Sequence, residues 1–335
     1  MEADLNLEYI STEINQVDLR IKNWLRFWLK SGEDESDRFR GLYITPQERS
    51  EIAGLSFGEN RQKSQDSTGI DEPSLFQLLE ESQQKSREIE QLAEQQDVQL
   101  RLLHLKTYFN LSDFEYKAFL ICLLPSLDLR YERIYGFLQD DVTKKQAGVD
   151  LILNILDDGT DGISRLQKLG DFSITGTLVR YRIIRGVNSS GEWQEPKLNQ
   201  LFEVSPAVVA WLMGDYFPEE NWLHLRRLER LQEDVQNSPF FSELNIDWQK
   251  VIDHRPLLAF DGPDETSMEL AAQKIAVLFG MPLLEVDLRT FAEDESFSLA
   301  MLRLFIRDAC ILEGIPYIQG FERLLDNDGF VKEDF

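Results

Sequence analysis

The chain has few of the residues that build metal centres and disulfide frameworks. Its 335 residues include two cysteines and three histidines. Cys122 and Cys310 each lie in an apolar run, which predicts small core residues in a reducing compartment and no disulfide. The histidines lack the spacing of metal ligands, so we expect no metal site; they are His104, His224 and His254.

Long apolar runs are also missing. No stretch of about 18 apolar residues occurs, and a helix that spans a membrane needs about that length. The beginning of the chain is charged and lacks the continuous apolar core of a signal peptide. We therefore expect a cytoplasmic protein with no membrane partner.

Positive charge is the third shortage. The chain carries 35 Lys and Arg residues against 60 Asp and Glu residues, which gives a formal net charge of −25. Such a field repels a phosphate backbone, so we expect protein partners rather than nucleic acid. Hydrophobic residues make up 42% of the chain, which is enough to build the cores of two or three domains.

Residues 257–280 have the pattern of a nucleotide-binding strand, loop and helix. An apolar run at 257–260 predicts the strand, and apolar residues at helical spacing over 267–279 predict the helix. A working phosphate loop between them would read G-x-x-x-x-G-K-[ST]. Counted from Gly262, the degenerate positions are Ser267 for the second glycine, Met268 for the lysine and Glu269 for the magnesium-binding hydroxyl.

The same loop is acidic. No basic residue occurs between Arg255 and Lys274. One unpaired carboxylate about 4 Å from a phosphate charge would cost roughly 4 kcal/mol at an effective dielectric constant near 20. The alternative is an ordinary βα unit of another α/β fold, in which Asp264 or Thr266 caps the helix. The carboxylates around the loop are Asp261, Asp264, Glu265 and Glu269.

A second loss follows the last predicted strand. Strands are predicted at 283–287 and 315–318, with a helix from about 296 to 312 between them. In a nucleotide hydrolase this last strand would end in an acidic pair that organises magnesium and polarises water. Gln319 and Gly320 occupy those positions here. We therefore predict no catalytic residue, no ATP and no magnesium in this chain.

Residues 1–103 predict a helical region. Apolar residues from Ile10 to Trp28 fall on one face of a long helix, and a second long helix is predicted from 73 to about 106. We expect the two helices to form an antiparallel hairpin or coiled coil with a polar central section. A capping box at 45–48 predicts a short helix between them, and the polar stretch 56–71 predicts a flexible linker.

Residues 104–216 predict a winged-helix domain. Ser112 and Glu115 form a capping box that opens an apolar helix, which Pro125 is expected to stop. Further helices precede two strands that flank a turn-rich loop, and Ser205 caps a last helix. The helices are predicted at 127–140, 147–156, 161–169 and 206–214, and the strands at 178–185 and 201–204.

The whole chain therefore predicts a multidomain fold. An N-terminal α-helical hairpin (1–103) precedes the α+β winged helix (104–216). A helical connector (217–251, with its helix at 221–236) then leads to an incomplete α/β P-loop module (252–335).

Several strings resemble one family. Residues 125–143 are similar to the winged-helix region that precedes the ATPase modules of bacterial AAA+ proteins associated with phage-tail-like contractile injection systems. Residues 40–44 are similar to a second recurrent string of that family, and the resemblance extends over 257–321. It implies that residues 252–335 are a degenerate AAA+ module, and that ATP and magnesium bind only in a complete module downstream. It also implies a ring-forming homo-oligomer for the full-length protein.

The sequence departs from this family at its end. Phe335 follows soon after the last predicted strand, before the sensor and arginine-finger motifs. An open half sheet would expose an edge and apolar surface, so we expect a fragment of a longer polypeptide. A shortened protein whose partner supplies the ATPase is the alternative.

Three functions remain open at this stage. The first is a non-catalytic regulatory and recruitment segment of an AAA+ ATPase, with injection-system components as partners. The second is a winged-helix regulator that binds nucleic acid, and the third is a protein-interaction scaffold with no ATPase role. Basic residues favour the second, although salt bridges to the surplus acids explain them more simply. They are Arg180, Arg182 and Arg185 on the predicted wing, and Arg165 and Lys168 on the helix before it.

Overall fold

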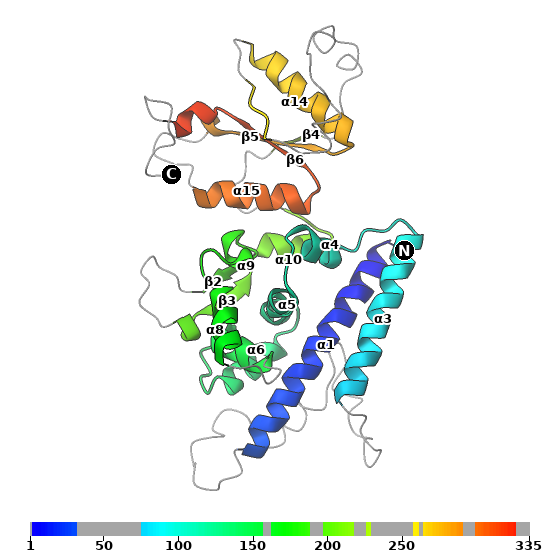
Figure 1. Ribbon diagram of the computed structural model, residues 1–335, viewed down its shortest axis with the longest axis vertical. Helices are drawn as coiled ribbons and strands as arrows, with labels where there is room; N and C mark the ends of the chain where they lie inside the picture. The colour runs from blue at the N-terminus through cyan, green and yellow to red at the C-terminus, as the bar shows by residue number, and fades with distance from the viewer. Residues whose placement is uncertain are drawn as a thin grey trace. The chain divides into compact units, whose positions relative to one another are not determined.

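The computed structural model forms two compact units, residues 1–217 and 218–335, which are described separately below (Figure 1). The structure describes residues 2–31, 75–156, 162–187, 197–217, 226–228, 257–260, 264–290 and 299–325. The predicted helix at 45–48, the linker at 56–71, the string at 40–44 and Gly262 lie outside these residues. Within the described ranges, the helices all fall short of the length and apolarity that a membrane crossing requires.

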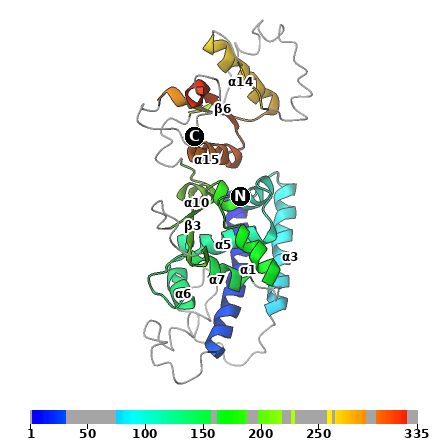
Figure 2. The ribbon, with the colours of Figure 1, turned by 60° about the vertical axis from the view of Figure 1, so that its left-hand side comes forward.

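The first unit begins with two long helices that lie side by side, α1 (Glu2–Ser31) and α3 (Leu75–Gln95) (Figures 1 and 2). Tyr9 donates a hydrogen bond to Glu90, and Gln16 donates one to Ser86, so the helices are antiparallel. The predicted apolar face of α1 is buried from Ile10 to Ile21. The predicted helical hairpin is therefore confirmed.

The centre of this hairpin is polar, as predicted. The Ser86 hydroxyl donates to Glu13 at 2.5 Å, and the Gln16 amide donates to the same carboxylate at 2.8 Å. Ser82 donates to the carbonyl oxygen of Thr12 at 3.2 Å. Because buried polar groups need partners, these contacts favour a single register of α1 against α3.

The second long helix is shorter than predicted. It ends at Gln95, and a separate helix, α4 (Arg101–Tyr108), follows a turn in which Asp97 has a φ of 54°. The Asn6 side chain holds this turn, because it donates to the carbonyl oxygen of Gln99 and accepts from the N–H of Arg101. A single helix over 73–106 was thus a wrong prediction, and the cause is a contact from a residue far away in sequence.

Helix α5 (Asp113–Leu127) is the buried centre of the first unit. It opens with the predicted capping box of Ser112 and Glu115, but it continues past Pro125. A proline inside a helix leaves the carbonyl four residues earlier without its usual donor. Here the Tyr135 hydroxyl donates to that carbonyl, of Ile121, at 2.8 Å. This contact explains why Pro125 does not stop the helix.

The remaining elements of the first unit have the layout of a winged helix. Strand β3 pairs with β1 on one side and β2 on the other, both antiparallel. Helices α7, α8 and α9 lie between the first two strands of this small sheet in sequence, and β2 and β3 flank the wing. The elements are α6 (Arg130–Leu138), β1 (Ala147–Gly148), α7 (Val149–Ile155), α8 (Gly162–Gly170), α9 (Thr177–Arg180), β2 (Ile184–Gly186), η2 (Lys197–Asn199), β3 (Leu201–Val204) and α10 (Pro206–Met213).

Two predicted elements of this region need correction. The strand predicted at 178–185 begins as helix α9, and only Ile184–Gly186 pairs with β3. Its apolar residues do not alternate strictly, since Ile183 and Ile184 are both buried. The helix predicted from residue 147 starts at Val149, because Ala147 and Gly148 form β1.

The second unit contains a three-stranded sheet. Strands β5 (Leu283–Asp287) and β6 (Ile315–Gln319) are parallel, and β4 (Arg226–Leu228) pairs antiparallel with β5. Helix α15 (Leu299–Ile311) lies between β5 and β6 in sequence, as a crossover helix does. The predicted strands at 283–287 and 315–318 are confirmed.

Helices cover both faces of this sheet (Figure 1). Leu283 packs with Ala272 and Ala276 of α14 (Glu265–Phe279). Leu284 and Val286 point the other way, into the cluster formed with α15. Because side chains alternate along a strand, Glu285 and Asp287 lie on the α14 side with Leu283.

Two predictions for this unit are wrong. Residues 257–260 form no strand; Leu257 is fully exposed, and Phe260 packs against the α14 cluster. Three residues of the helix predicted at 221–236 form β4 instead, because they pair with the edge of β5. The rest of that predicted helix lies outside the described residues.

Candidate functional site at the carboxyl ends of strands β5 and β6

The carboxyl end of β5 turns sharply so that Arg289 lies over Asp287. A 3-10 turn, η4 (Leu288–Thr290), follows the strand directly. The Asp287 carboxylate accepts from the backbone N–H of Arg289 at 2.9 Å, and the Thr290 hydroxyl donates to the Asp287 carbonyl oxygen at 2.6 Å. This local turn aims the guanidinium back across the end of the sheet.

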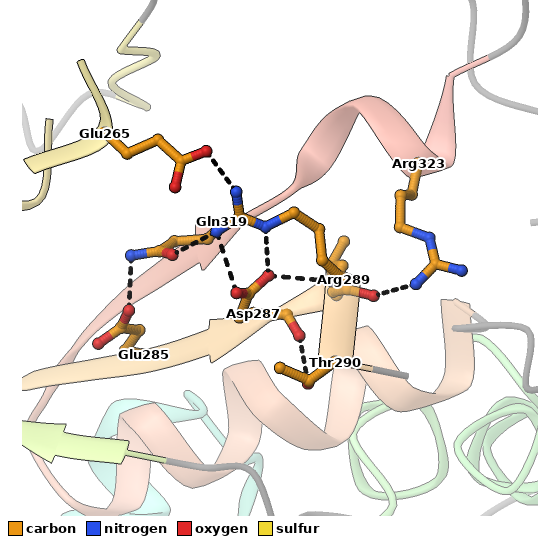
Figure 3. Close-up of polar contacts among 8 residues, drawn as sticks. Glu265, Glu285, Asp287, Arg289, Thr290, Gln319 and Arg323 are labelled. Atoms are coloured by element: carbon orange, nitrogen blue, oxygen red, sulfur yellow. Dashed lines mark hydrogen bonds and ion pairs between the residues drawn. The ribbon is translucent and has the colours of Figure 1, made fainter. Parts of the chain in front are cut away.

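The Arg289 guanidinium contacts three separate elements (Figure 3). Its Nε and one terminal nitrogen donate to the two Asp287 oxygens of β5 at 2.9 and 3.0 Å. The other terminal nitrogen donates to Glu265, the first residue of α14. The side-chain oxygen of Gln319, the last residue of β6, accepts from Arg289 at 3.0 Å.

Gln319 extends this cluster to a fourth charged residue. Its amide nitrogen donates to Glu285 at 2.6 Å while its oxygen accepts from Arg289. Glu285 is only 6% exposed, so its carboxylate depends on such donors. The amide therefore links the guanidinium to a buried acid. We call Glu265, Glu285, Asp287, Arg289 and Gln319 the Arg289 cluster.

Gly320 leaves room for Arg289. It has a φ of 70°, a left-handed conformation that L-residues with a side chain rarely adopt. A Cβ at this position would lie 2.7 Å from Cγ of Arg289. Glycine at 320 thus satisfies both the turn after β6 and the close approach of the arginine side chain.

The charges of the cluster are matched to one another. Hydrogen bonds from Arg289 lower the pKa of the Asp287 carboxyl, so Asp287 stays ionised at neutral pH. Hydrogen bonds to Asp287 and then to Glu265 raise the pKa of Arg289. Two carboxylates, Asp287 and Glu265, contact the guanidinium directly, and Glu285 is linked to it through Gln319, so acids outnumber the arginine in this cluster. A triphosphate would meet repulsion here.

The sequence-predicted positions divide between this cluster and α14. Gln319 belongs to the Arg289 cluster, and Gly320 lies against the Arg289 side chain. Ser267 instead donates to Asp264, which caps α14, and Glu269 accepts from Gln273 one turn later. Met268 is partly buried, and Gly262 lies outside the described residues.

Sequence reasoning missed Arg289 and the two acids of β5, although it noted Glu265 as a carboxylate of the loop. The available signal was the alternation of acids in an otherwise apolar strand, at Glu285 and Asp287, with a basic residue directly after it. Among the described residues, no three acidic, histidine or cysteine side chains gather as ligands for a metal ion.

The basic residues of the winged-helix unit contact groups of the same unit. Arg165 donates to Asp150 and Asn154, both at 2.9 Å. Arg185 pairs with Glu203 across the β2–β3 hairpin at 2.8 Å. Lys168 lies 5.4 Å from the centre of the Phe114 ring, and Arg180 lies 5.8 Å from that of Tyr181. These contacts agree with salt bridging and stacking as the role of these residues.

Helix α8 exposes apolar residues at the place where a DNA-reading helix would expose polar ones. In this layout α8 is the second helix after β1, which is the position of the recognition helix, and the short helix α9 separates it from the wing. Ile163 is 68% exposed and Leu166 is 69% exposed. Neither side chain offers a hydrogen bond to a base edge.

Asp171, directly after α8, gives the unit a pH dependence. Burial, with a smaller effect of the Glu115 charge, raises the pKa of its carboxyl to about 6. Since folding favours the protonated form, the cost of its ionisation is absent below about pH 4 and is complete above the folded pKa. We expect Asp171→Asn to stabilise the unit by about 1 kcal/mol at pH 7.5, after discounting for solvent screening, and to have little effect at pH 4. Urea unfolding at the two pH values measures this; equal effects at both would contradict it.

Comparison with known proteins adds one finding. The family model described as winged helix domain, variant, matches residues 4–221. The match covers α1 and α3 as well as the helices and wing that follow. No curated protein and no solved structure matches the chain. The domain borders predicted at 103/104 and 216/217 stay predictions.

Proposed function

Because the chain belongs to the family of variant winged-helix domains, we propose that its first unit is a regulatory and protein-recruiting domain of an AAA+ ATPase. Two features support recruitment of protein. The net charge is −25, and α8 exposes Ile163 and Leu166 where nucleic-acid readers place polar side chains. Burial of such apolar residues favours association with a protein surface.

The second unit is, in this proposal, a degenerate AAA+ module with no catalytic activity. Parallel strands β5 and β6 with their crossover helix, and α14 on the opposite face, support a P-loop-like arrangement. The observation that carries the proposal is the Arg289 cluster. Its contacts occupy the strand ends and the helix start, where such a fold would hold phosphates and magnesium. ATP hydrolysis is assigned to a complete downstream module.

The link to contractile injection systems rests on the string at 125–143. Several of its residues make internal contacts: Tyr131 donates to Asp18, Tyr135 to the Ile121 carbonyl, and the Gln139 oxygen accepts from Gly148. These contacts explain why the string suits this fold. The injection-system role, the ring-forming homo-oligomer and the cytoplasmic location are parts of the proposal that rest on the resemblance and on charge.

Nucleic-acid binding is the second candidate, because winged helices are common DNA-binding domains. Exposed Arg180 and Arg182 favour it. A scaffold with no ATPase role is the third candidate, and it shares every feature of the Arg289 cluster. A gel shift that is sequence-selective and persists at physiological salt would favour the second; affinity that vanishes there would not.

Co-purification tests the proposed role directly. The tagged chain is isolated from cells with and without the injection-system genes, and bound proteins are identified. We expect tail, baseplate or sheath components together with an ATPase module. Leu166→Glu, which places a charge on the exposed face of α8, should lose the client, whereas Gln167→Glu on the same helix serves as a matched control. If none of these components is enriched, the injection-system role fails.

A further inference from the structure

The Arg289 cluster joins parts of the second unit that the chain itself does not hold together. Glu265 begins α14, Asp287 ends β5, and Gln319 ends β6. The guanidinium reaches all three through the hydrogen bonds described above (Figure 3). In a working P-loop module, the phosphates and their magnesium ion join these same places. Arg289 thus makes contacts within the chain at the place where a nucleotide would bridge these elements.

The carboxylates need this cation. Without Arg289, the acids Glu265, Glu285 and Asp287 would meet at one edge of the sheet with an excess of like charge, which is unfavourable at short range. Arginine suits the position because its planar fork binds both Asp287 oxygens and still has a donor for Glu265. A lysine would offer a single charged nitrogen.

The backbone is adapted to this side chain as well. Gly320 has no Cβ to collide with Cγ of Arg289, and its left-handed φ positions the chain directly after Gln319. The η4 turn is fixed by the Asp287 carboxylate and the Thr290 hydroxyl. Arg323, from the turn after Gly320, donates to the Leu288 carbonyl oxygen at 2.7 Å and ties the two turns together.

We propose that Arg289 is a resident cation that holds α14 to the ends of β5 and β6, so that the second unit keeps one conformation without nucleotide. The inference deepens the proposed function and rests on it, because it takes the unit as a degenerate nucleotide-binding module. A module fixed in this way gives its neighbours a constant surface through every cycle of ATP hydrolysis elsewhere in the protein. Such a module has a fixed shape that does not change with nucleotide.

Hydrogen exchange of the full chain, resolved by mass spectrometry, tests the proposal. In Arg289→Ala, we expect amides in 264–272 and in the β5–β6 pair to exchange about tenfold faster, which corresponds to a loss of about 1.4 kcal/mol. Arg303→Ala makes the same charge change on α15, outside the Arg289 cluster, and should leave these amides unchanged. Arg289→Lys should fall between wild type and Arg289→Ala. Peptides from α5 report that the first unit stays folded.

A second variant distinguishes loss of one contact from unfolding of the whole second unit. Glu265→Gln removes only the ion pair with α14, so exchange should rise in 264–272 while the β5–β6 pair stays protected. If Arg289→Ala and Glu265→Gln both exchange like wild type, the proposal is wrong. Magnesium–ATP added to wild type separates the two hypotheses. Slowed exchange at these peptides would show that the module binds nucleotide and would overturn its assignment as degenerate. Unchanged exchange in the variants alone would overturn only the role of Arg289.

Discussion

Asp18→Ala should destabilise the first unit by about 3 kcal/mol, because it removes the acceptor of the buried Tyr131 hydroxyl and the ion pair with the partly buried Lys22. The Asp18 carboxylate accepts from the Tyr131 hydroxyl at 2.6 Å and pairs with Lys22 at 2.9 Å. Asp18 lies on α1 and Tyr131 on α6, so the contact joins the helical hairpin to the winged helix. Burial, together with the Asp18 charge, raises the pKa of Tyr131 well above its usual range, so the hydroxyl remains a donor.

Urea unfolding of the variants measures this effect. Tyr131→Phe leaves Asp18 paired with Lys22, so we expect a loss of about 1 kcal/mol. Glu8→Ala breaks the exposed pair with Lys85 on the same hairpin, and its effect should stay below about 0.5 kcal/mol. If Asp18→Ala costs no more than Glu8→Ala, the hairpin is not held to the winged helix in this way.

Gly320→Ala should destabilise the second unit by about 3 kcal/mol. A left-handed φ costs an alanine about 1 kcal/mol, and the new Cβ would displace Arg289 from its partners. The charged hydrogen bonds to Asp287 and Gln319 would then weaken. Hydrogen exchange of peptides from the β5–β6 pair measures the loss without interference from the first unit.

Gly280 provides a matched control for this substitution. It ends α14 with a φ of 66°, and nothing lies within 4 Å of an added Cβ. Gly280→Ala should therefore cost only the backbone term, about 1 kcal/mol. The difference between the two alanine variants isolates the contact with Arg289. Equal costs would mean that Arg289 moves aside freely and that its contacts contribute little.

Local patterns were sufficient for much of the winged-helix unit. The apolar face from Ile10 to Ile21 and the capping box of Ser112 and Glu115 depend on neighbours within a few residues, so spacing alone predicts them. Pro125 shows the limit of such rules. Its helix continues because the Tyr135 hydroxyl, from another helix, replaces the lost donor.

The candidate site was harder to predict, since its residues meet only through the sheet. Spacing identified what is missing at Ser267, Met268 and Gln319 but not what replaces it. Arg289 lies 24 residues from Glu265 and 30 from Gln319, and parallel pairing of β5 with β6 brings them together. The strand predicted at 257–260 was wrong for a related reason. A short apolar run forms a strand only when a neighbouring strand pairs with it.

Titration calorimetry of magnesium–ATP into the full chain tests the central claim most directly. The Arg289 cluster and its excess of carboxylates occupy the strand ends, so we predict no magnesium-dependent binding at micromolar nucleotide concentrations. ADP should behave in the same way. A saturable, magnesium-dependent heat with a micromolar dissociation constant would contradict the claim that this module works without nucleotide.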